Sequence, residues 1–243
     1  MVIHYCWFGG KDKPEKVKYC IESWKKVCPA AEIKEWNEDN FDVLKNPFSA
    51  RAYSLKKYAF VADYARFDIL FREGGIYLDT DVELLKDITP LLKTSFSGFE
   101  RENAVAPGLI VYAEKGDKII KEALDFYDNF TFESAEKYDF YNETVVNIFT
   151  DILVKHGLTL NGKTQTVDGF TVYATEYFNP KGGDYGKEKR TENTYSVHHY
   201  LASWKTPLDQ KIMEYRVKYG RKKGTVLFCV FHPILALKKR RDK

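Results

Sequence analysis

Residues 55–81, LKKYAFVADYARFDILFREGGIYLDTD, contain the pattern that decides the fold. Apolar residues recur at helical spacing as far as Glu73, and the double glycine Gly74-Gly75 ends that predicted helix. The short apolar run 76–78 follows as a predicted strand and leads directly into Asp79-Thr80-Asp81. A strand that ends in two carboxylates places them at the carboxyl edge of a sheet, where open α/β sheets bind ligands.

The segments before and after this stretch extend it into an α/β fold. The chain begins with a predicted strand, a predicted helix and a second strand, and this β-α-β order favours a parallel sheet with crossover helices. We therefore expect one domain with a mostly parallel, Rossmann-like central sheet flanked by helices. The expected strands are 2–8, 31–36, 95–100, 108–113, 170–174 and 195–200, and the other expected helices are 14–27, 117–128 and 142–156.

Composition excludes several classes of protein. With 44% hydrophobic and 16% aromatic residues in 243, the chain is not intrinsically disordered, and four cysteines are too few for a disulfide-stapled miniprotein. The N-terminus shows no secretory signal, and the longest apolar run, residues 225–237, is shorter than a spanning helix and contains His232-Pro233. We expect reduced thiols and a cytoplasmic protein.

The Asp79-Thr80-Asp81 motif has three readings. A bare DXD is most often a solvated turn after a strand. It also resembles the nucleophile motif of haloacid-dehalogenase-type phosphatases, with Asp79 as nucleophile, but Glu83 stands where that motif requires Thr or Val. The third reading is a site for Mg²⁺ or Mn²⁺ bound to a nucleotide diphosphate, because two hard carboxylates suit such ions.

The surrounding residues favour the third reading. Residues 58–66, YAFVADYAR, and 74–81, GGIYLDTD, resemble the core motif of the DXD-containing glycosyltransferases of family 32. Residues 3–10, IHYCWFGG, look like that family's first strand, and residues 197–204, VHHYLASW, look like its closing His-rich, Ser-Trp motif. The resemblance spans residues 2 to about 205 and implies a GT-A-like fold, a divalent cation and a retaining sugar transfer.

This resemblance implies roles for residues around the motif. Asp63 would accept hydrogen bonds from ribose or sugar hydroxyls, and Arg66 would hold the sugar or phosphate. Without the DXD beside them, these two residues would read as an exposed i,i+3 ion pair. Tyr77 is expected to share a face with Asp79 and line the donor pocket. Asp81 is the expected direct metal ligand, with Asp79 contacting ribose or reaching the metal through water.

Three further positions complete the predicted site. Trp7 is the candidate for stacking on the nucleotide base, although a Trp at a strand end is more often part of the core. His198 and His199 must face opposite ways on a strand, and the family pattern favours His199 as a third metal or diphosphate ligand. Ser203 and Trp204 are expected to close over the diphosphate.

The expected reaction moves a hexose from a nucleotide-diphosphate sugar, with UDP favoured over GDP, to a glycan or lipid-linked glycan acceptor. Capsular or other surface polysaccharide synthesis is the expected setting, with Mn²⁺ or Mg²⁺ as cofactor. Two alternatives stay open: a non-catalytic carbohydrate- or membrane-binding protein that retains the fold, and a phosphatase. Residues 106–109 and 141–144 occupy positions where the family builds its sugar and acceptor pockets.

Charge separates the chain into two parts. Residues 216–243 hold ten basic residues and one acid, whereas residues 1–215 carry a net charge of −6. We expect a catalytic domain over 1–215 and a basic, apolar tail over 216–243. The tail is either an element docked on the core or an anchor for an anionic membrane. As an anchor, it would hold the protein peripherally on the inner face of the cell membrane. Without a recognition module, nucleic acid is not an expected partner.

Overall fold

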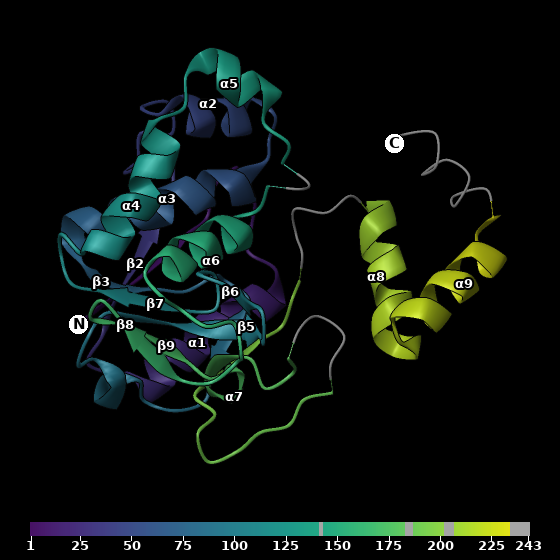
Figure 1. The fold of residues 1–243 in the computed structure, drawn as a ribbon. Helices are drawn as coiled ribbons and strands as arrows, with labels where there is room; N and C mark the ends of the chain where they lie inside the picture. Colours follow the sequence, from purple (N-terminus) through teal and green to yellow (C-terminus); the bar gives the residue numbers. More distant parts are fainter. Residues whose placement is uncertain (141–142, 183–186, 202–206, 234–243) are drawn as a thin grey trace.

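The computed structural model describes residues 1–140, 143–182, 187–201 and 207–233. Figure 1 shows an α/β body formed by the first two hundred residues and a separate pair of helices after it. The elements are β1 Val2–Cys6, α1 Glu15–Val27, β2 Glu32–Trp36, α2 Pro47–Ser54, α3 Tyr58–Glu73, β3 Gly75–Tyr77, β4 Val82–Leu84, the 3-10 helix η1 Thr89–Leu91, β5 Phe96–Arg101, β6 Ala104–Val105, β7 Val111–Ala113, α4 Lys118–Asp128, α5 Phe132–Lys137, α6 Val145–Lys155, β8 Gln165–Val167, β9 Phe170–Tyr173, α7 Thr175–Phe178, β10 Ser196–His198, α8 Pro207–Tyr219 and α9 Arg221–Phe231.

The central sheet is mixed, with most strands running in one direction. Its order is β2-β1-β3-β7-β5-β9-β8, with β6 paired to β5, and a separate ladder joins β10 to β4. Strand β1 is parallel to both β2 and β3, and β5 is parallel to β9, whereas β7 and β8 run antiparallel to their neighbours. The expected α/β class with a mostly parallel sheet is confirmed.

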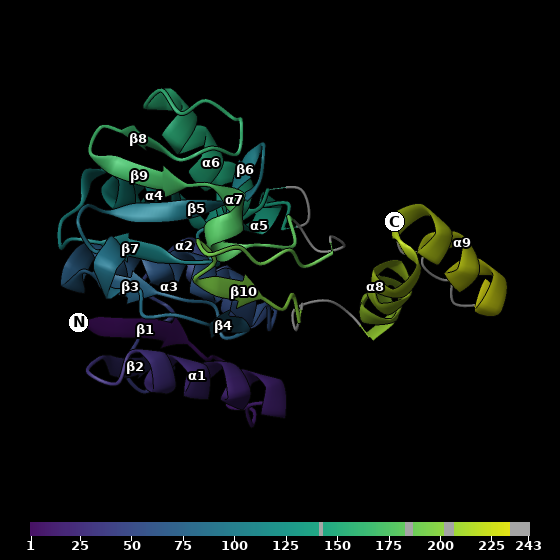
Figure 2. The ribbon, with the colours of Figure 1, turned by 90° about the horizontal axis from the view of Figure 1, so that it is seen from below.

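Helices cover both faces of this sheet, as Figure 2 shows from below. Helices α3, α4 and α6 lie on one face, and α1 and α7 lie on the other. Side chains of β1 alternate between the two faces, because Ile3 belongs to the buried apolar cluster that contains Trp24 of α1, whereas Cys6 belongs to the cluster that contains Phe67 of α3. The predicted crossover arrangement therefore buries apolar side chains on both sides of the sheet.

Helix α3 and the turn after it position the DXD residues. Every residue from Phe60 to Leu70 is buried, so α3 is enclosed on all sides. It begins at Tyr58, later than the expected residue 55, because Lys56 has a left-handed φ of 56°. Gly75 has a φ of 99°, and a Cβ there would lie 2.9 Å from His4 Nε2, so the close approach of β1 requires glycine.

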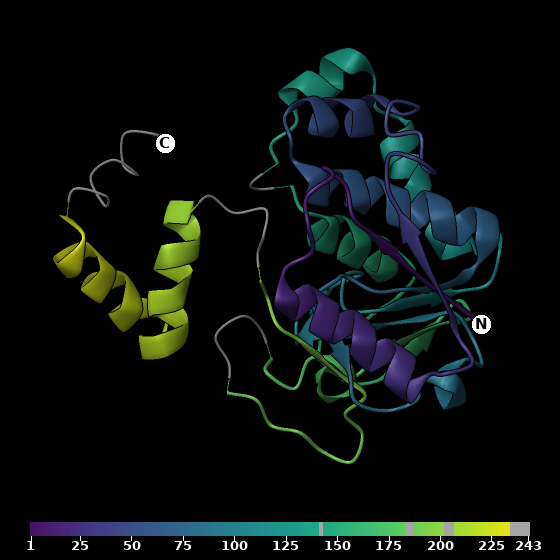
Figure 3. The ribbon, with the colours of Figure 1, turned by 180° about the vertical axis from the view of Figure 1, so that it is seen from behind.

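The C-terminal segment forms two helices, which we call the helix pair, α8 and α9. The expected boundary after residue 215 falls inside α8, so it does not coincide with a break between elements. In all three ribbon views the helix pair stands apart from the sheet (Figures 1–3). Within the described ranges, no helix is long and apolar enough to cross a membrane.

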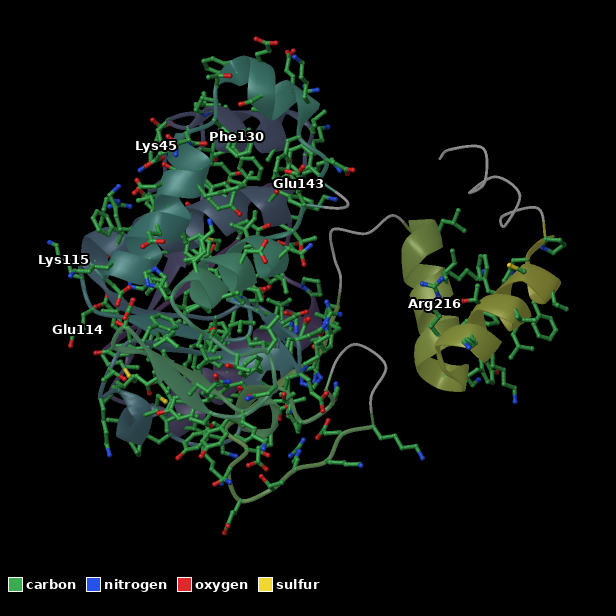
Figure 4. All side chains as sticks on the ribbon, viewed as in Figure 1. Lys45, Glu114, Lys115, Phe130, Glu143 and Arg216 are labelled. Atoms are coloured by element: carbon green, nitrogen blue, oxygen red, sulfur yellow. The ribbon has the colours of Figure 1, made fainter. Side chains whose placement is uncertain are left out.

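A small core holds the helix pair together. Phe228 of α9 is buried and packs edge-on against Tyr215 of α8. A Cβ at Gly224 would lie 2.3 Å from the Tyr215 carbonyl oxygen, so the two helices cross where α9 has no side chain. Arg216, labelled in Figure 4 between the two helices, donates from Nε to Thr225 Oγ1 at 2.9 Å.

Candidate functional site

Arg66 links the helix to the DXD segment. Its Nη2 donates to Asp63 Oδ1 at 2.8 Å and to Asp79 Oδ1 at 3.2 Å, and its guanidinium lies over the ring of Tyr77 at 4.8 Å. Arg66 and Asp63 are both buried, so the pair is not the exposed ion pair of the alternative reading. Burial raises the pKa of Asp63 to about 7, although the positive charge of Arg66 acts to lower that pKa.

Asp81 is held from the opposite side by the segment around β10. His198 Nε2 lies 2.9 Å from Asp81 Oδ1, and the Leu201 amide donates to Asp81 Oδ2 at 2.8 Å. Antiparallel pairing of β10 with β4 places His198 opposite Val82, one residue after Asp81. Burial acts to raise the pKa of Asp81, but His198 and these hydrogen bonds hold it below its ordinary value.

Asp79, Asp81 and His198 form what we call the Asp-Asp-His cluster. Each offers one ligand atom, and the three atoms all lie within 4.8 Å of one another. The two carboxylates suit Mn²⁺ or Mg²⁺, and the imidazole favours a transition-metal ion such as Mn²⁺ over Mg²⁺. Within the part of the chain that the structure describes, His198 Nδ1 is buried without a hydrogen-bond partner. These residues therefore fit a divalent cation.

The choice between the two histidines is corrected by this geometry. The side chains of His198 and His199 do reach different acids, as alternation along a strand requires. However, His198 meets Asp81, whereas His199 Nε2 lies 2.8 Å from Glu83 Oε2. The physical reason is the register, which carries His198 to the strand end beside Asp81. Glu83 also accepts a hydrogen bond from Tyr19 at 2.7 Å, so His199 belongs to a neighbouring polar network.

Gly108 is a site residue whose role the sequence did not reveal. Its carbonyl oxygen accepts a hydrogen bond from the Asp79 amide at 3.0 Å. A Cβ there would lie 2.0 Å from Asp79 Oδ2 and 3.3 Å from Arg66 Nη1. Because Gly108 has no side chain, the Asp79 carboxylate can occupy this space. A glycine after a proline is the available signal, but the family pattern indicates only a sugar or acceptor pocket at residues 106–109.

Tyr77 lies beneath the site. Its side chain is 1% exposed, packed under Arg66, and burial raises its pKa well above the ordinary value. Cys6, at the end of β1, is buried beside it, and burial raises the pKa of that thiol to about 12. Tyr77 thus supports the Arg66 guanidinium from below. Ser203 and Trp204 lie outside the described residues.

A polar cavity of about 520 Å³ opens at the carboxyl ends of β1 and β2. Trp7 forms part of its wall, with its Nε1 donating to the Lys11 carbonyl oxygen at 2.6 Å. Gly9 has a φ of 93°, and a Cβ there would lie 2.3 Å from the ring of Tyr58. The lining residues are Trp7, Gly9, Gly10, Lys11, Lys13, Glu35, Asn37, Glu38, Asp39, Tyr53 and Tyr58.

The cavity and the Asp-Asp-His cluster lie at one edge of the sheet. Strand β1 lies between β2 and β3, so the residues after all three strands meet at their shared carboxyl edge. Trp7 follows β1, Asn37 follows β2, and Asp79 and Asp81 follow β3. The fold and the site therefore define an α/β protein with a ligand cavity beside residues that suit a divalent cation.

Comparison with known proteins agrees with this class. Residues 14–97 match the family described as "Glycosyltransferase sugar-binding region containing DXD motif". Over 218 residues the chain is 25% identical to an uncharacterized glycosyltransferase, L373, of Acanthamoeba polyphaga mimivirus, covering 84% of this chain and 82% of that protein. The resemblance to DXD-containing glycosyltransferases is confirmed, and a glycosyltransferase-like function is supported. Membership of family 32 in particular stays a prediction.

Two solved structures show a partial likeness to this chain. The PaToxG glycosyltransferase is 21% identical with a TM-score of 0.48, covering 63% of this chain and 68% of that chain. A glycosyltransferase involved in glycosylation of the major capsid of PBCV-1 is 11% identical with a TM-score of 0.45, covering 88% of this chain and 98% of that chain.

Proposed function

We propose that this protein is a metal-dependent, retaining glycosyltransferase that moves a hexose from a nucleotide-diphosphate sugar, UDP rather than GDP, to a glycan acceptor. The observation that carries the proposal is the Asp-Asp-His cluster, bridged to Arg66 and placed at the same sheet edge as the polar cavity. We further propose surface polysaccharide synthesis, with a lipid-linked glycan as acceptor, as its setting.

The cavity fits the nucleoside and the cluster fits the diphosphate. Trp7 would stack on the base, because an indole face accepts any planar base, and the Gly9-Gly10 backbone allows close approach of the ligand. A divalent cation held by Asp79, Asp81 and His198 would neutralise charge on the departing diphosphate. Arg66 holds the Asp79 carboxylate in place through Oδ1, at 3.2 Å.

Arg66 and Asp63 would act on the sugar. The guanidinium is fixed by Asp63, Asp79 and the Tyr77 ring, so it can orient a hydroxyl or phosphate oxygen without first losing side-chain entropy. Asp63 can accept a hydrogen bond when ionised or donate one when protonated. Retention would follow from attack on the same face of the sugar from which the nucleoside diphosphate departs.

The test is donor binding and turnover with a panel of UDP- and GDP-sugars, with and without Mn²⁺. The site variant is Asp81→Asn, which keeps the size of the side chain and removes its charge. The matched control is Asp125→Asn on α4, a half-exposed carboxylate that pairs with Lys121 and lies on a different element from the Asp-Asp-His cluster. We expect metal-dependent turnover of one UDP-sugar by the wild type and the control, and a loss of roughly 100-fold or more in Asp81→Asn, since a metal ligand is removed.

Three outcomes would contradict the proposal. If no sugar nucleotide binds in the presence of metal, the chain is a binding protein that retains the fold. If a phosphomonoester is hydrolysed instead, with Asp79 as nucleophile, the phosphatase alternative holds. Inverted product stereochemistry, read by NMR of the transferred sugar, would contradict retention alone.

A further inference from the structure

The outer surface of α9 is apolar at one end and basic at the other. Val226 is 61% exposed and Val230 is 65% exposed, and they lie one turn apart on the same face of the helix. Lys222 precedes Val226 by one turn, and both Lys222 and Lys223 are exposed. Cys229 and Phe231, also exposed, widen the apolar end. This surface, which we call the α9 outer face, consists of Lys222, Lys223, Val226, Cys229, Val230 and Phe231.

The α9 outer face is not needed to hold the helix pair together. Phe228, at 1% exposed, packs against Tyr215 of α8, and Ile212 of α8 is also buried, at 6% exposed. Val226, Val230 and Phe231 are each more than 60% exposed, so the described part of the body does not cover this face. Neighbouring exposed apolar side chains of this kind mark a surface that another body covers.

The positive charge of the C-terminal segment indicates what covers the α9 outer face. The sequence has no acidic residue from Arg216 to Arg241, and a second basic run, residues 238–241, follows the helix. The body, by contrast, carries a net charge of −6 over residues 1–215. A helix that combines exposed apolar side chains with flanking cations fits the boundary between acyl chains and anionic headgroups. An eleven-residue helix is only about 16 Å long at 1.5 Å per residue, half the hydrocarbon thickness, so it would lie along the surface.

We propose that the helix pair docks on an anionic lipid bilayer through the α9 outer face, with the valines in the acyl region and the lysines at the headgroups. The acidic body would be repelled by the same headgroups, so it would be held on the aqueous side of the pair. This proposal does not depend on the glycosyltransferase function, because none of the residues that carry it belongs to the site.

The experiment measures binding of the full chain to vesicles of phosphatidylcholine alone and of phosphatidylcholine with about one third phosphatidylglycerol. We expect binding to the anionic vesicles that weakens with added salt, because the Debye length shortens. Val226→Ser with Val230→Ser should lower the partition coefficient roughly tenfold by removing buried apolar area. Lys222→Gln with Lys223→Gln should lower it about fivefold per lysine.

Two controls separate docking from unfolding and from non-specific adhesion. Val154→Ser replaces an exposed valine of α6 on the body, 41% exposed, and should bind vesicles as the wild type does. Circular dichroism and thermal unfolding should be the same in every variant, because each substituted side chain is exposed. In a second readout, anionic vesicles should slow the reaction of Cys229 with a thiol reagent, since Cys229 lies on the α9 outer face.

The proposal is overturned if the wild type does not bind anionic vesicles, or if the double valine variant binds as tightly as the wild type. It is also overturned if vesicles leave Cys229 reactivity unchanged. Size-exclusion chromatography with light scattering identifies the competing occupant. A dimer that dissociates in the double valine variant, without vesicle binding by the wild type, would assign the α9 outer face to a second copy of the chain.

Discussion

Arg66 sets the charge balance of the site. It is 3% exposed and donates to two carboxylates that come from different elements, Asp63 on α3 and Asp79 after β3. A buried guanidinium without partners would be strongly unfavourable, and these two carboxylates compensate the buried charge of Arg66. The helix and the strand end are therefore joined by charge as well as by packing, which fixes the position of Asp79 before any ligand binds.

The two neighbouring histidines should differ in their effect on metal binding. His198→Gln should lower Mn²⁺ affinity roughly 10- to 100-fold, because an imidazole of the Asp-Asp-His cluster is lost. His199→Gln should leave the affinity within a few-fold of wild type, because His199 pairs with Glu83. Isothermal titration with Mn²⁺ measures both affinities. The reverse ranking would restore His199 as the ligand and contradict the geometry described above.

Gly108→Ala should damage the cluster with little effect on the core. A Cβ at this position would lie 2.0 Å from Asp79 Oδ2, so the carboxylate must move away from its place beside Arg66. We expect a loss of roughly 10- to 100-fold in Mn²⁺ affinity, comparable to other losses of supporting groups around metals. The measurement is the same titration, with thermal unfolding alongside it.

Gly98→Ala is the matched comparison for that variant. A Cβ there would lie 2.5 Å from the ring of Phe178, a buried core side chain, rather than from a carboxylate. This variant should lose roughly 1–3 kcal/mol of stability through overpacking, while the folded fraction still binds Mn²⁺. Equal loss of Mn²⁺ affinity in both variants would show that Gly108 acts only through stability.

At the scale of elements, His156 joins three parts of the body. It caps the C-terminus of α6, and its Nδ1 lies 2.6 Å from Asp168 Oδ2 in the turn between β8 and β9. Its Nε2 lies 2.9 Å from Glu122 Oε1 of α4. The hydrogen bond to Asp168 is the main reason that the pKa of His156 lies above its ordinary value, with Glu122 adding to the effect. Protonation of His156 therefore stabilises the contact between these elements.

This contact should make stability depend on pH. Because the folded-state pKa is raised, the contribution of His156 is fully present below the unfolded value of about 6.5 and is lost as pH rises through the folded value. Wild type should therefore exceed His156→Gln in Tm by more at about pH 5.5 than at about pH 8.5. Asp168→Asn should remove much of the same pH dependence. A Tm difference that is independent of pH would contradict the assignment.

The central elements could be predicted because their signals are local. The helix 55–73 and the strand before Asp79 follow from periodicity and a double glycine, and α3 and β3 confirm both within a few residues. Helix α2 was not predicted, although Asn46 accepts from the Phe48 amide and Pro47 occupies the first turn, which is a recognisable start signal. Its eight residues carry too short an apolar pattern to be found by periodicity.

The candidate site could be predicted only in part, because one of its residues is placed by strand pairing between distant parts of the chain. Asp63, Arg66, Asp79 and Asp81 lie on consecutive local elements, and the structure does bring them together. His198 is 117 residues from Asp81 in the chain, so its position depends on the register of β10 against β4. Alternation shows that two adjacent histidines diverge, but it does not show which of them faces the site.

For the whole molecule, the four cysteines should report on folding. Cys6, Cys20 and Cys28 are buried and Cys229 is exposed, and all four are free thiols. Burial also raises the pKa of Cys6 and of Cys20 to about 12, so little reactive thiolate forms at neutral pH. A thiol reagent should therefore modify one cysteine rapidly in the native protein and four after denaturation. Rapid modification of two or more in the native state would contradict the packing of the body.

The place of β1 in the sheet also governs how the chain can fold during synthesis. Residues 2–6 lie between β2 and β3, so β1 acquires its second neighbour only after residue 77 has emerged from the ribosome. Parallel pairing across such a separation is slow, because the intervening loop must close before the contact is gained. Until then β1 exposes an unpaired edge, which makes the nascent chain a natural client for chaperones. Because His198 lies on β10, the Asp-Asp-His cluster can be complete only after β10 has also paired with β4, so the site forms late.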